Sequence, residues 1–352
     1  MDVIKQICAP IELEFEEFRK RYSSLFSSAN PGVDILLKFL LERKGKLMRP
    51  ILVLLVAKCY GQVNDSIYHL ASAVELLHQG SLIHDDVVDE SDKRRGKQSA
   101  NAVYDNKMAV LLGDYIVSMA LRQITATSNV KSVDALSTLV GTLSEGEITQ
   151  LNALDNTTLS EDLYFDIISK KTAILFSSCT SLSALLSGAS DAEIEAFRQF
   201  GHVAGLCFQI MDDILDYHDS SETGKPSGND LKEGKFTLPA IYALTHSDRD
   251  WSGHIKAIRA LEATPEQIRE VTEYSVSNGG IEYSLAKMEE LKKQAIQGLP
   301  AFISAELRGS FECYLELITN RSSNLSARRL APMRKRVLLS HSFPRTIFAI
   351  VQ

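Results

Sequence analysis

The long stretch without proline between Pro50 and Pro226 restricts the fold of this chain more than any other feature. Proline breaks a helix because it lacks a backbone N–H and clashes with the preceding turn, whereas this stretch is rich in Ala, Leu, Ser and Glu. Capping boxes at 190–193 and 264–267 mark two helix starts. No segment alternates apolar and polar residues as a half-buried strand does. We therefore predict an all-α fold, with a first helix at about residues 11–25.

Most of the chain has the features of a single domain. No linker longer than a loop divides residues 1–321, and 45% of all residues are hydrophobic, as in an ordinary globular protein. Residues 322–352 differ, because they contain basic but no acidic residues and have no helical period. We predict one large helical bundle over 1–321 and a basic tail, disordered or atypical, over 322–352.

Charge and cysteine content exclude several classes of protein. The net charge is −7 and would be more negative without the basic tail, so nucleic acid is not an expected partner. The five cysteines are widely spaced with no C-x-x-C pair, which argues against disulfides or a zinc site and suits a reducing cytoplasm. The acidic N-terminus is unlike a signal peptide, and the longest apolar run, Ile51 to Ala57, is too short to cross a bilayer. We expect a cytoplasmic protein without a transmembrane segment.

Two acidic motifs of the form D-D-x-x-D each end an apolar segment. They are formed by Asp85, Asp86 and Asp89, and by Asp212, Asp213 and Asp216. In a helix, carboxylates at i and i+4 lie one turn apart on one face and repel each other unless a cation intervenes. One such motif could equally be a solvated helix end. Two of them indicate a cavity that binds Mg²⁺ through carboxylates and substrate phosphate oxygens.

Basic residues flank both acidic motifs. They are Lys46 and Arg49 in a basic turn, Arg94 and Arg95 after the first motif, and Lys225 and Lys235 after the second. Arginine binds phosphate oxygens bidentately and lysine binds them as a point charge. Each pair alone would be an ordinary solvated pair, but their placement favours a diphosphate site. His78 by itself is more often a core residue than a ligand, and His84 fits a structural role.

The order of these motifs is similar to that of the trans-isoprenyl diphosphate synthases, and within them to the octaprenyl- and solanesyl-type polyprenyl diphosphate synthases. The resemblance runs from about Lys38 to Arg321. Besides both acidic motifs it includes Gly45-Lys46-x-x-Arg49-Pro50, His78, Arg94-Arg95-Gly96, Gly113-Asp114, Glu145-Gly146-Glu147, Lys171-Thr172, Gln209, Gly224-Lys225 and Gly234-Lys235-x-Thr237-x-Pro239. It implies a helical bundle around a central cavity, and a homodimer.

The resemblance also implies a role for each position. Isopentenyl diphosphate would bind at Lys46, Arg49, His78 and Arg95. Three Mg²⁺ ions would be bound by Asp85, Asp89 and Asp212, with Asp86, Asp213 and Asp216 in support. The allylic diphosphate and the cation that it generates would contact Arg94, Lys171, Thr172, Gln209, Lys225 and Lys235. Catalysis would depend most on Lys171, Thr172, Asp85, Asp89 and Asp212.

The implied reaction condenses isopentenyl diphosphate with an allylic diphosphate, expected to be farnesyl diphosphate, in repeated Mg²⁺-dependent head-to-tail steps. Cationic charge stabilises the departing diphosphate, and the carbocation that remains needs a dry, apolar cavity. The product would be a long-chain all-trans polyprenyl diphosphate, as for a quinone side chain, and it would be handed to a membrane.

Small residues below the first acidic motif bear on product length. Gly80 and Ser81 lie about one turn before Asp85, and Leu77 lies deeper. In the resembling family, long-chain enzymes have small residues here and short-chain enzymes have bulky aromatic ones. Because an ideal helix places Gly80 roughly 140° from Asp85, its effect would be to let a neighbouring wall recede. A facing helix near residues 115–121 could close the tunnel.

Three alternatives remain open. The chain could be a shorter-chain synthase of the geranylgeranyl type. A class I terpene cyclase shares the first motif and the all-α bundle, but the second D-D-x-x-D argues against it. A non-catalytic subunit of a heteromeric synthase usually lacks aspartates or arginines that are present here. Because family members end near residues 317–321, we expect deletion of 322–352 to leave activity intact.

Overall fold

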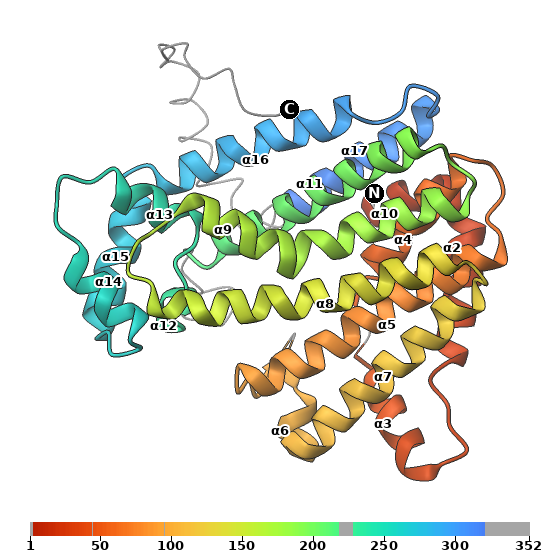
Figure 1. Cartoon of the computed structure of the whole chain (residues 1–352), viewed down its shortest axis with the longest axis horizontal. Helices are drawn as coiled ribbons and strands as arrows, with labels where there is room; N and C mark the ends of the chain where they lie inside the picture. The colour runs from red at the N-terminus through yellow and green to blue at the C-terminus, as the bar shows by residue number, and fades with distance from the viewer. Residues whose placement is uncertain (1–2, 44, 95, 218–227, 321–352) are drawn as a thin grey trace.

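The computed structural model describes residues 3–43, 45–94, 96–217 and 228–320, and helices make up about three quarters of this part (Figure 1). The helices are α1 (Val3–Cys8), η1 (Ala9–Ile11), α2 (Glu12–Ser24), α3 (Pro31–Leu41), α4 (Met48–Lys58), α5 (Asp65–Val88), α6 (Ala100–Tyr104), α7 (Asn106–Ala126), α8 (Val130–Asn152), η2 (Ala153–Asp155), α9 (Glu161–Ile168), η3 (Ser169–Ala173), α10 (Ile174–Leu186), α11 (Asp191–Leu215), α12 (Asn229–Lys232), α13 (Leu238–Thr245), α14 (Ser252–Arg259), α15 (Pro265–Ser277), α16 (Gly280–Gln297) and α17 (Ala305–Thr319). The all-α prediction is confirmed. The predicted tail at 322–352 lies outside the described residues.

The predicted helix starts agree with the structure. The first predicted helix corresponds to α2, and α11 and α15 begin at the two capping boxes. At the first box, the N–H of Ser190 donates to the Glu193 carboxylate at 2.7 Å, and the N–H of Glu193 donates to the Ser190 hydroxyl at 3.4 Å. These bonds satisfy donors that a helix start otherwise leaves without a partner.

A short hairpin is the element that the sequence did not predict. Its strands β1 (Lys93–Arg94) and β2 (Lys97–Gln98) pair antiparallel, with Arg94 opposite Lys97. Gly96 in the turn has a φ of +75°, which glycine adopts without strain. A strand of two residues is too short to produce an alternating pattern, so hydrophobic periodicity could not reveal it.

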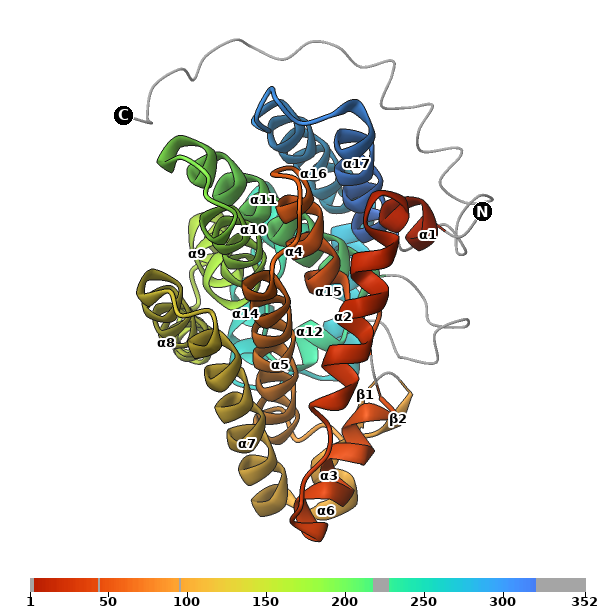
Figure 2. The same cartoon turned by 90° about the vertical axis from the view of Figure 1, so that its right-hand side faces the viewer.

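Helix α5 passes through the middle of the bundle, and Figure 2 shows neighbouring helices around it. It packs most extensively on α7 and also contacts α4, α10 and α2. Every residue from Leu70 to Leu77 is buried, including Glu75. This segment is buried on all sides because its sequence is apolar on nearly every face of the helix.

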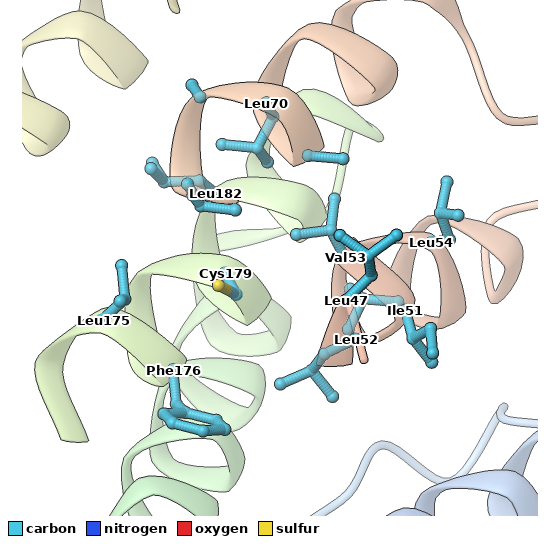
Figure 3. Close-up of a cluster of buried hydrophobic side chains, with 14 of the residues drawn as sticks. Leu47, Ile51, Leu52, Val53, Leu54, Leu70, Leu175, Phe176, Cys179 and Leu182 are labelled. Carbon is cyan, nitrogen blue, oxygen red and sulfur yellow. The ribbon is translucent and has the colours of Figure 1, made fainter. Parts of the chain in front are cut away.

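The core between α4, α5 and α10 contains the longest apolar run of the sequence. All residues from Ile51 to Ala57 are fully buried. They belong to the same buried cluster as Leu70 of α5 and Phe176 and Cys179 of α10, and Figure 3 shows part of this cluster. Burying one such side chain contributes roughly 1.5–3 kcal/mol, so this cluster fixes the position of α5. All five cysteines are free thiols, as predicted.

Helix α11 packs along α10 at close range because it contains two glycines. A Cβ atom at Gly201 would overlap the Thr180 hydroxyl of α10, and one at Gly205 would overlap the Cα of Ala173, which ends η3 directly before α10. A second core continues from α11 to α13, α15 and α16. Helices α5 and α11 both end toward the left of Figure 1. None of the helices in the described ranges is long and apolar enough to cross a membrane.

Candidate active site

The first acidic motif lies where α5 ends. Asp89 is the C-cap residue, and its N–H donates to the carbonyl of Asp85 at 2.8 Å. Burial, and to a lesser degree the nearby carboxylate of Glu147, raise the pKa of Asp85 to about 6, whereas Lys171 opposes the rise. The ionised form of Asp85 is therefore less stable than that of a solvated aspartate, and additional positive charge would stabilise it.

Asp86 has a different environment. It is only 4% exposed, its Oδ1 accepts a hydrogen bond from Nε of Arg94 at 2.7 Å, and Nη2 of the same arginine forms an ion pair with this oxygen at 2.7 Å. Its backbone carbonyl accepts from the side chain of Asn101 at 3.2 Å and from the N–H of Ser91 at 2.9 Å. Asp86 and Arg94, predicted as a metal-supporting residue and a diphosphate ligand, thus bind each other and hold the hairpin against α5.

The second acidic motif ends α11, and its middle carboxylate is buried. Asp213 is 4% exposed and accepts hydrogen bonds from the hydroxyl of Tyr164 at 2.7 Å and from the side-chain amide of Gln209 at 2.8 Å. The Thr172 hydroxyl in turn donates to Gln209 at 2.8 Å. Burial raises the pKa of Asp213 to about 7, although both hydrogen bonds act against the rise. The neighbouring Asp212, in contrast, is exposed to solvent.

A loop connects the second motif to the first. The Asp216 carboxylate accepts from the side-chain amide of Asn229 at 3.1 Å and from the N–H of Asp230 at 3.0 Å. At the other end of this loop, Nζ of Lys235 lies 3.8 Å from Oδ1 of Asp89 and 2.6 Å from a carboxylate oxygen of Glu233. The two motifs, far apart in sequence, therefore face the same region.

Lys171 and Thr172 lie in η3, which is a π-helical turn between α9 and α10. Nζ of Lys171 is 2.8 Å from the Glu147 carboxylate on α8. A Cβ atom at Gly146 would lie 2.9 Å from the backbone N of Lys171, so glycine allows α8 to approach this turn. Single π-helical turns occur frequently at functional sites because they redirect side chains within a helix.

A pocket of about 240 Å³ opens between α3, α5 and the hairpin, and one of the four residues predicted to bind isopentenyl diphosphate lines it. His78 lines it together with Asp86, Arg94 and two residues without a predicted role, Arg43 and Lys97. The hairpin closes this pocket, because Lys97 donates to the carbonyl of Glu42 at 3.1 Å.

Other predicted ligands are not gathered in this pocket. Lys46 is exposed in the turn before α4, and the Arg49 guanidinium lies 4.9 Å from the centroid of the Phe176 ring. The side chains of Arg95 and Lys225 lie outside the described residues.

The residues predicted to set product length divide into two groups. A Cβ atom at Gly80 would lie 2.9 Å from Cγ2 of Val117 and 3.3 Å from the carbonyl oxygen of Gly113, so Gly80 allows close contact between α5 and α7. Ser81 is partly exposed and donates to the carbonyl of His78 at 3.0 Å, while Leu77 is buried. The predicted facing helix near 115–121 belongs to α7.

His84 packs against α7, as a structural histidine would. A Cβ atom at Gly113 would overlap its ring, and its Nε2 lies 3.3 Å from the Asp114 carboxylate. The Gly113-Asp114 pair therefore forms the contact surface for His84.

Sequence reasoning missed Tyr164 and gave no role to Glu147 or Asn101. Tyr164 has no distinguishing spacing, and only the fold brings it to Asp213, 49 positions away. Glu147 could have been paired with Lys171 by charge, because it is one of two acids beside a glycine on α8. Asn101 donates to the backbone carbonyls of Asp86 and Ser91, and a bond to a backbone acceptor leaves no signal in the sequence.

The carboxylates do not form a complete metal cage. Within the described ranges, no group of three or more His, Cys, Asp or Glu residues is arranged to bind an ion by itself. Mg²⁺ commonly uses one or two carboxylates and takes its other ligands from phosphate and water.

Comparison with known proteins identifies similar chains. A family model described as polyprenyl synthetase matches residues 32–275. An octaprenyl diphosphate synthase of Escherichia coli is 34% identical over 74% of this chain and 81% of its own. A geranylgeranyl pyrophosphate synthase structure from Bacteroides thetaiotaomicron is 39% identical, covers 91% of this chain and 100% of its own, and has a TM-score of 0.80. A Caulobacter crescentus polyprenyl synthase, complexed with calcium and isoprenyl diphosphate, is 30% identical, with coverages of 90% and 98% and a TM-score of 0.83.

Proposed function

Because the chain belongs to the polyprenyl synthetase family and is therefore a prenyl transferase, we propose that it condenses isopentenyl diphosphate with an allylic diphosphate. The observation that carries this proposal is the loop from Gly228 to Lys235. It is hydrogen-bonded to the second acidic motif and brings an ammonium group 3.8 Å from the first. Carboxylates and cations of two distant segments thereby surround one region, as binding of a metal diphosphate requires.

The six carboxylates of the two acidic motifs would have two different roles in Mg²⁺ binding. Asp85, Asp89 and Asp212 would hold the ions, because each is at least partly accessible at a helix end. The carboxylates of Asp86, Asp213 and Asp216 already accept hydrogen bonds from protein groups and would keep the motifs in shape. When bound, Mg²⁺ would take up negative charge on the leaving diphosphate. The Caulobacter relative, with its calcium and isoprenyl diphosphate, supports a divalent ion here.

The cationic and polar residues would act on the allylic substrate. Lys171 and Lys235 would bind the diphosphate oxygens as point charges, and Lys225 and Arg94 would join them. The amide oxygen of Gln209 accepts the Thr172 hydroxyl at 2.8 Å, so the two side chains are held together beside Asp213. Their oxygen dipoles would stabilise the carbocation that forms when the C–O bond breaks.

Isopentenyl diphosphate would occupy the region around His78. The pocket there is lined by the ring of His78 and by the charged side chains of Arg43 and Lys97. We propose as further ligands Lys46 and Arg49, which are not among the residues that line it, and Arg95, whose side chain lies outside the described residues. The apolar interior below Asp85, which includes Val74 and Leu77, would exclude water from the carbocation and receive the growing chain.

We propose a long-chain all-trans product. The octaprenyl synthase relative and the small side chain of Ser81 near the first motif support it. The geranylgeranyl synthase relative supports a shorter product as the second candidate.

The proposed function is tested by incubating the purified full-length protein with MgCl₂, labelled isopentenyl diphosphate and farnesyl diphosphate. A linear product with several added isoprene units is expected, and it should be absent when EDTA replaces MgCl₂. A cyclic hydrocarbon would indicate a terpene cyclase, and no turnover would favour a non-catalytic subunit. A single added unit would indicate the geranylgeranyl-type synthase.

We also propose that the protein forms a homodimer. Large apolar side chains are exposed on the neighbouring helices α7 and α8, namely Leu111 (62%), Tyr115, Leu121, Ile148 (58%) and Leu151 (51%). A clustered exposed apolar surface is typical of a protein–protein interface.

A further inference from the structure

Arg259 is the last residue of α14 and lies outside every motif identified in the sequence. Its Nη1 donates to the carbonyl of Gly234 at 2.9 Å. Its guanidinium carbon lies 5.1 Å from the centroid of the Phe236 ring. Gly234 and Phe236 are the two neighbours of Lys235, so Arg259 contacts the loop on both sides of this lysine.

The turn at Gly234 is built to lie against the end of α14. Its φ is +75°, and a Cβ atom there would lie 2.7 Å from Cδ2 of Leu154 and 3.2 Å from the carbonyl oxygen of Ile258. Leu261, just after α14, has a φ of +58°, a left-handed conformation that residues other than glycine rarely adopt. The N–H of Glu262 donates to the carbonyl of Ala257 at 2.9 Å, which closes the helix end below this turn.

The guanidinium of Arg259 also faces the region of the second acidic motif. It lines a pocket of about 130 Å³ together with Lys171, Asp213 and Lys235. Nε of Arg259 is buried and has no hydrogen-bond acceptor among the residues described, and burial lowers the pKa of this arginine. A half-buried charge is costly unless its donors are used, and here the carbonyl of Gly234 uses one.

The loop that Arg259 contacts is attached at its other end. The N–H of Gly228 donates to the carbonyl of Asp216 at 2.9 Å, and the N–H of Lys235 donates to the carbonyl of Asp230 at 2.7 Å. The start of the loop is therefore fixed by the second acidic motif. Its end, which brings Nζ of Lys235 to the first motif, is fixed by Arg259.

We infer that Arg259 is a positioning residue for Lys235, because it holds the carbonyl of Gly234 and so fixes the end of the loop that links the two acidic motifs. This inference rests on the proposed function, in which Lys235 binds the allylic diphosphate. Arg259 acts on the substrate only through Lys235.

The first test compares Arg259→Leu and Arg259→Lys with the matched control Arg269→Leu, which removes an exposed arginine on the adjacent α15. Arg259→Leu should raise KM for the allylic diphosphate about tenfold, the scale of one lost hydrogen bond to a charged group, with KM for isopentenyl diphosphate within twofold of wild type. Arg259→Lys, which keeps a donor, should recover most of the loss, and Arg269→Leu should match wild type. Equal changes in both KM values would overturn the inference.

The second test needs no turnover. Calorimetric binding of inorganic pyrophosphate in the presence of MgCl₂ is measured for Arg259→Leu, Lys235→Ala and the double variant. If Arg259 acts through Lys235, the double variant should bind as Lys235→Ala does, because coupled residues are not additive. Additive losses would mean that Arg259 binds the diphosphate itself, which would overturn the inference.

Folding and the proposed function are monitored separately. Trp251, the single tryptophan of the chain, is buried next to the start of α14, so its fluorescence reports whether this region stays folded. If Arg259→Leu does not fold, Arg259→Met, which also lacks a donor for the Gly234 carbonyl, replaces it in both tests with the same expected results. If wild type binds Mg²⁺-pyrophosphate but transfers no prenyl group, the proposed function fails while the coupling in the second test still decides the inference.

Discussion

The negative charge of Asp85 is less stable in the folded protein than in water. Its pKa is about 6 in the folded protein, because burial and Glu147 oppose ionisation more than Lys171 and Arg94 favour it. Between pH 4 and 6, roughly, the folded state holds a proton that the unfolded state has released, so the free energy of unfolding falls as pH rises through this window.

Replacing Asp85 by Asn should therefore stabilise the metal-free protein while abolishing activity. At pH 7.5 in EDTA we expect a gain on the order of 1 kcal/mol, reduced from the full value by solvent screening, and little gain at pH 4. Urea denaturation at both pH values measures this difference. The exposed Asp134→Asn serves as the control, and an Asp85→Asn variant that behaves like it at both pH values would contradict the assignment.

The role of a side chain could be predicted from the sequence only where the spacing of charged residues forms a recognisable pattern. The D-D-x-x-D spacing predicted two clusters of carboxylates, each at the end of a helix, and the structure has them at the ends of α5 and α11. The pairing of Asp86 with Arg94 depends on a hairpin of two-residue strands, which leaves no periodic signal. Tyr164 reaches Asp213 only through the packing of α9 beside α11, so no local pattern could have identified it.

At the level of elements, glycines decide how closely helices approach the site. Gly146 of α8 faces the π-helical turn η3, and a Cβ atom there would lie 2.9 Å from a backbone nitrogen and 3.1 Å from the Lys170 carbonyl carbon. Backbone atoms of a packed helix cannot move aside as a flexible side chain can. Gly141, on the same helix, has open space around its Cα.

Gly146→Ala should consequently displace η3 and reduce turnover, whereas Gly141→Ala should not. We expect at least a tenfold loss of kcat for Gly146→Ala, since small displacements of catalytic groups are costly. Gly141→Ala should keep wild-type turnover and gain about 0.5–1 kcal/mol from helix propensity. Steady-state kinetics and thermal melting of the two variants check this, and equal turnover in both would contradict the role given to Gly146.

Gly80 and Ser81 should respond differently to a bulky substitution, although they are neighbours in α5. Gly80→Phe would push into Val117 of α7 and should destabilise the fold by at least 1–3 kcal/mol, roughly the cost of overpacking a core. Ser81→Phe, at a partly exposed position, should leave the melting temperature close to that of wild type and shorten the product. Product chromatography and thermal melting distinguish the two, and a stable Gly80→Phe enzyme with a shortened product would show that Gly80 lines the tunnel.

At the scale of the whole molecule, the bundle brings together two motifs that lie more than a hundred residues apart in the sequence. Helix content and helix starts were predictable because proline distribution and capping boxes are local signals. The partner helices were not predictable, since packing of α5 on α7 and of α10 on α11 depends on buried glycines whose contacts lie far away in sequence. The loop that connects the motifs is visible only in three dimensions.

The exposed apolar surface on α7 and α8 predicts an effect of substitution on assembly. Leu111→Glu should convert a dimer to a monomer in sedimentation at micromolar concentration, because a charge at an apolar interface is left without a partner. Leu13→Glu, on the exposed face of α2, should leave the sedimentation coefficient unchanged. A wild-type protein that sediments as a monomer, or a Leu111→Glu variant that remains a dimer, would contradict the proposed interface.

The claim on which the proposed function depends is that both acidic motifs form a single site for one metal diphosphate. It is tested most directly by calorimetric titration of wild type, Asp89→Asn and Asp212→Asn with inorganic pyrophosphate in MgCl₂. We predict that wild type binds pyrophosphate only when MgCl₂ is present, and that each substitution alone weakens binding by at least tenfold, about 1.4 kcal/mol. Wild-type affinity in either variant would contradict a shared site.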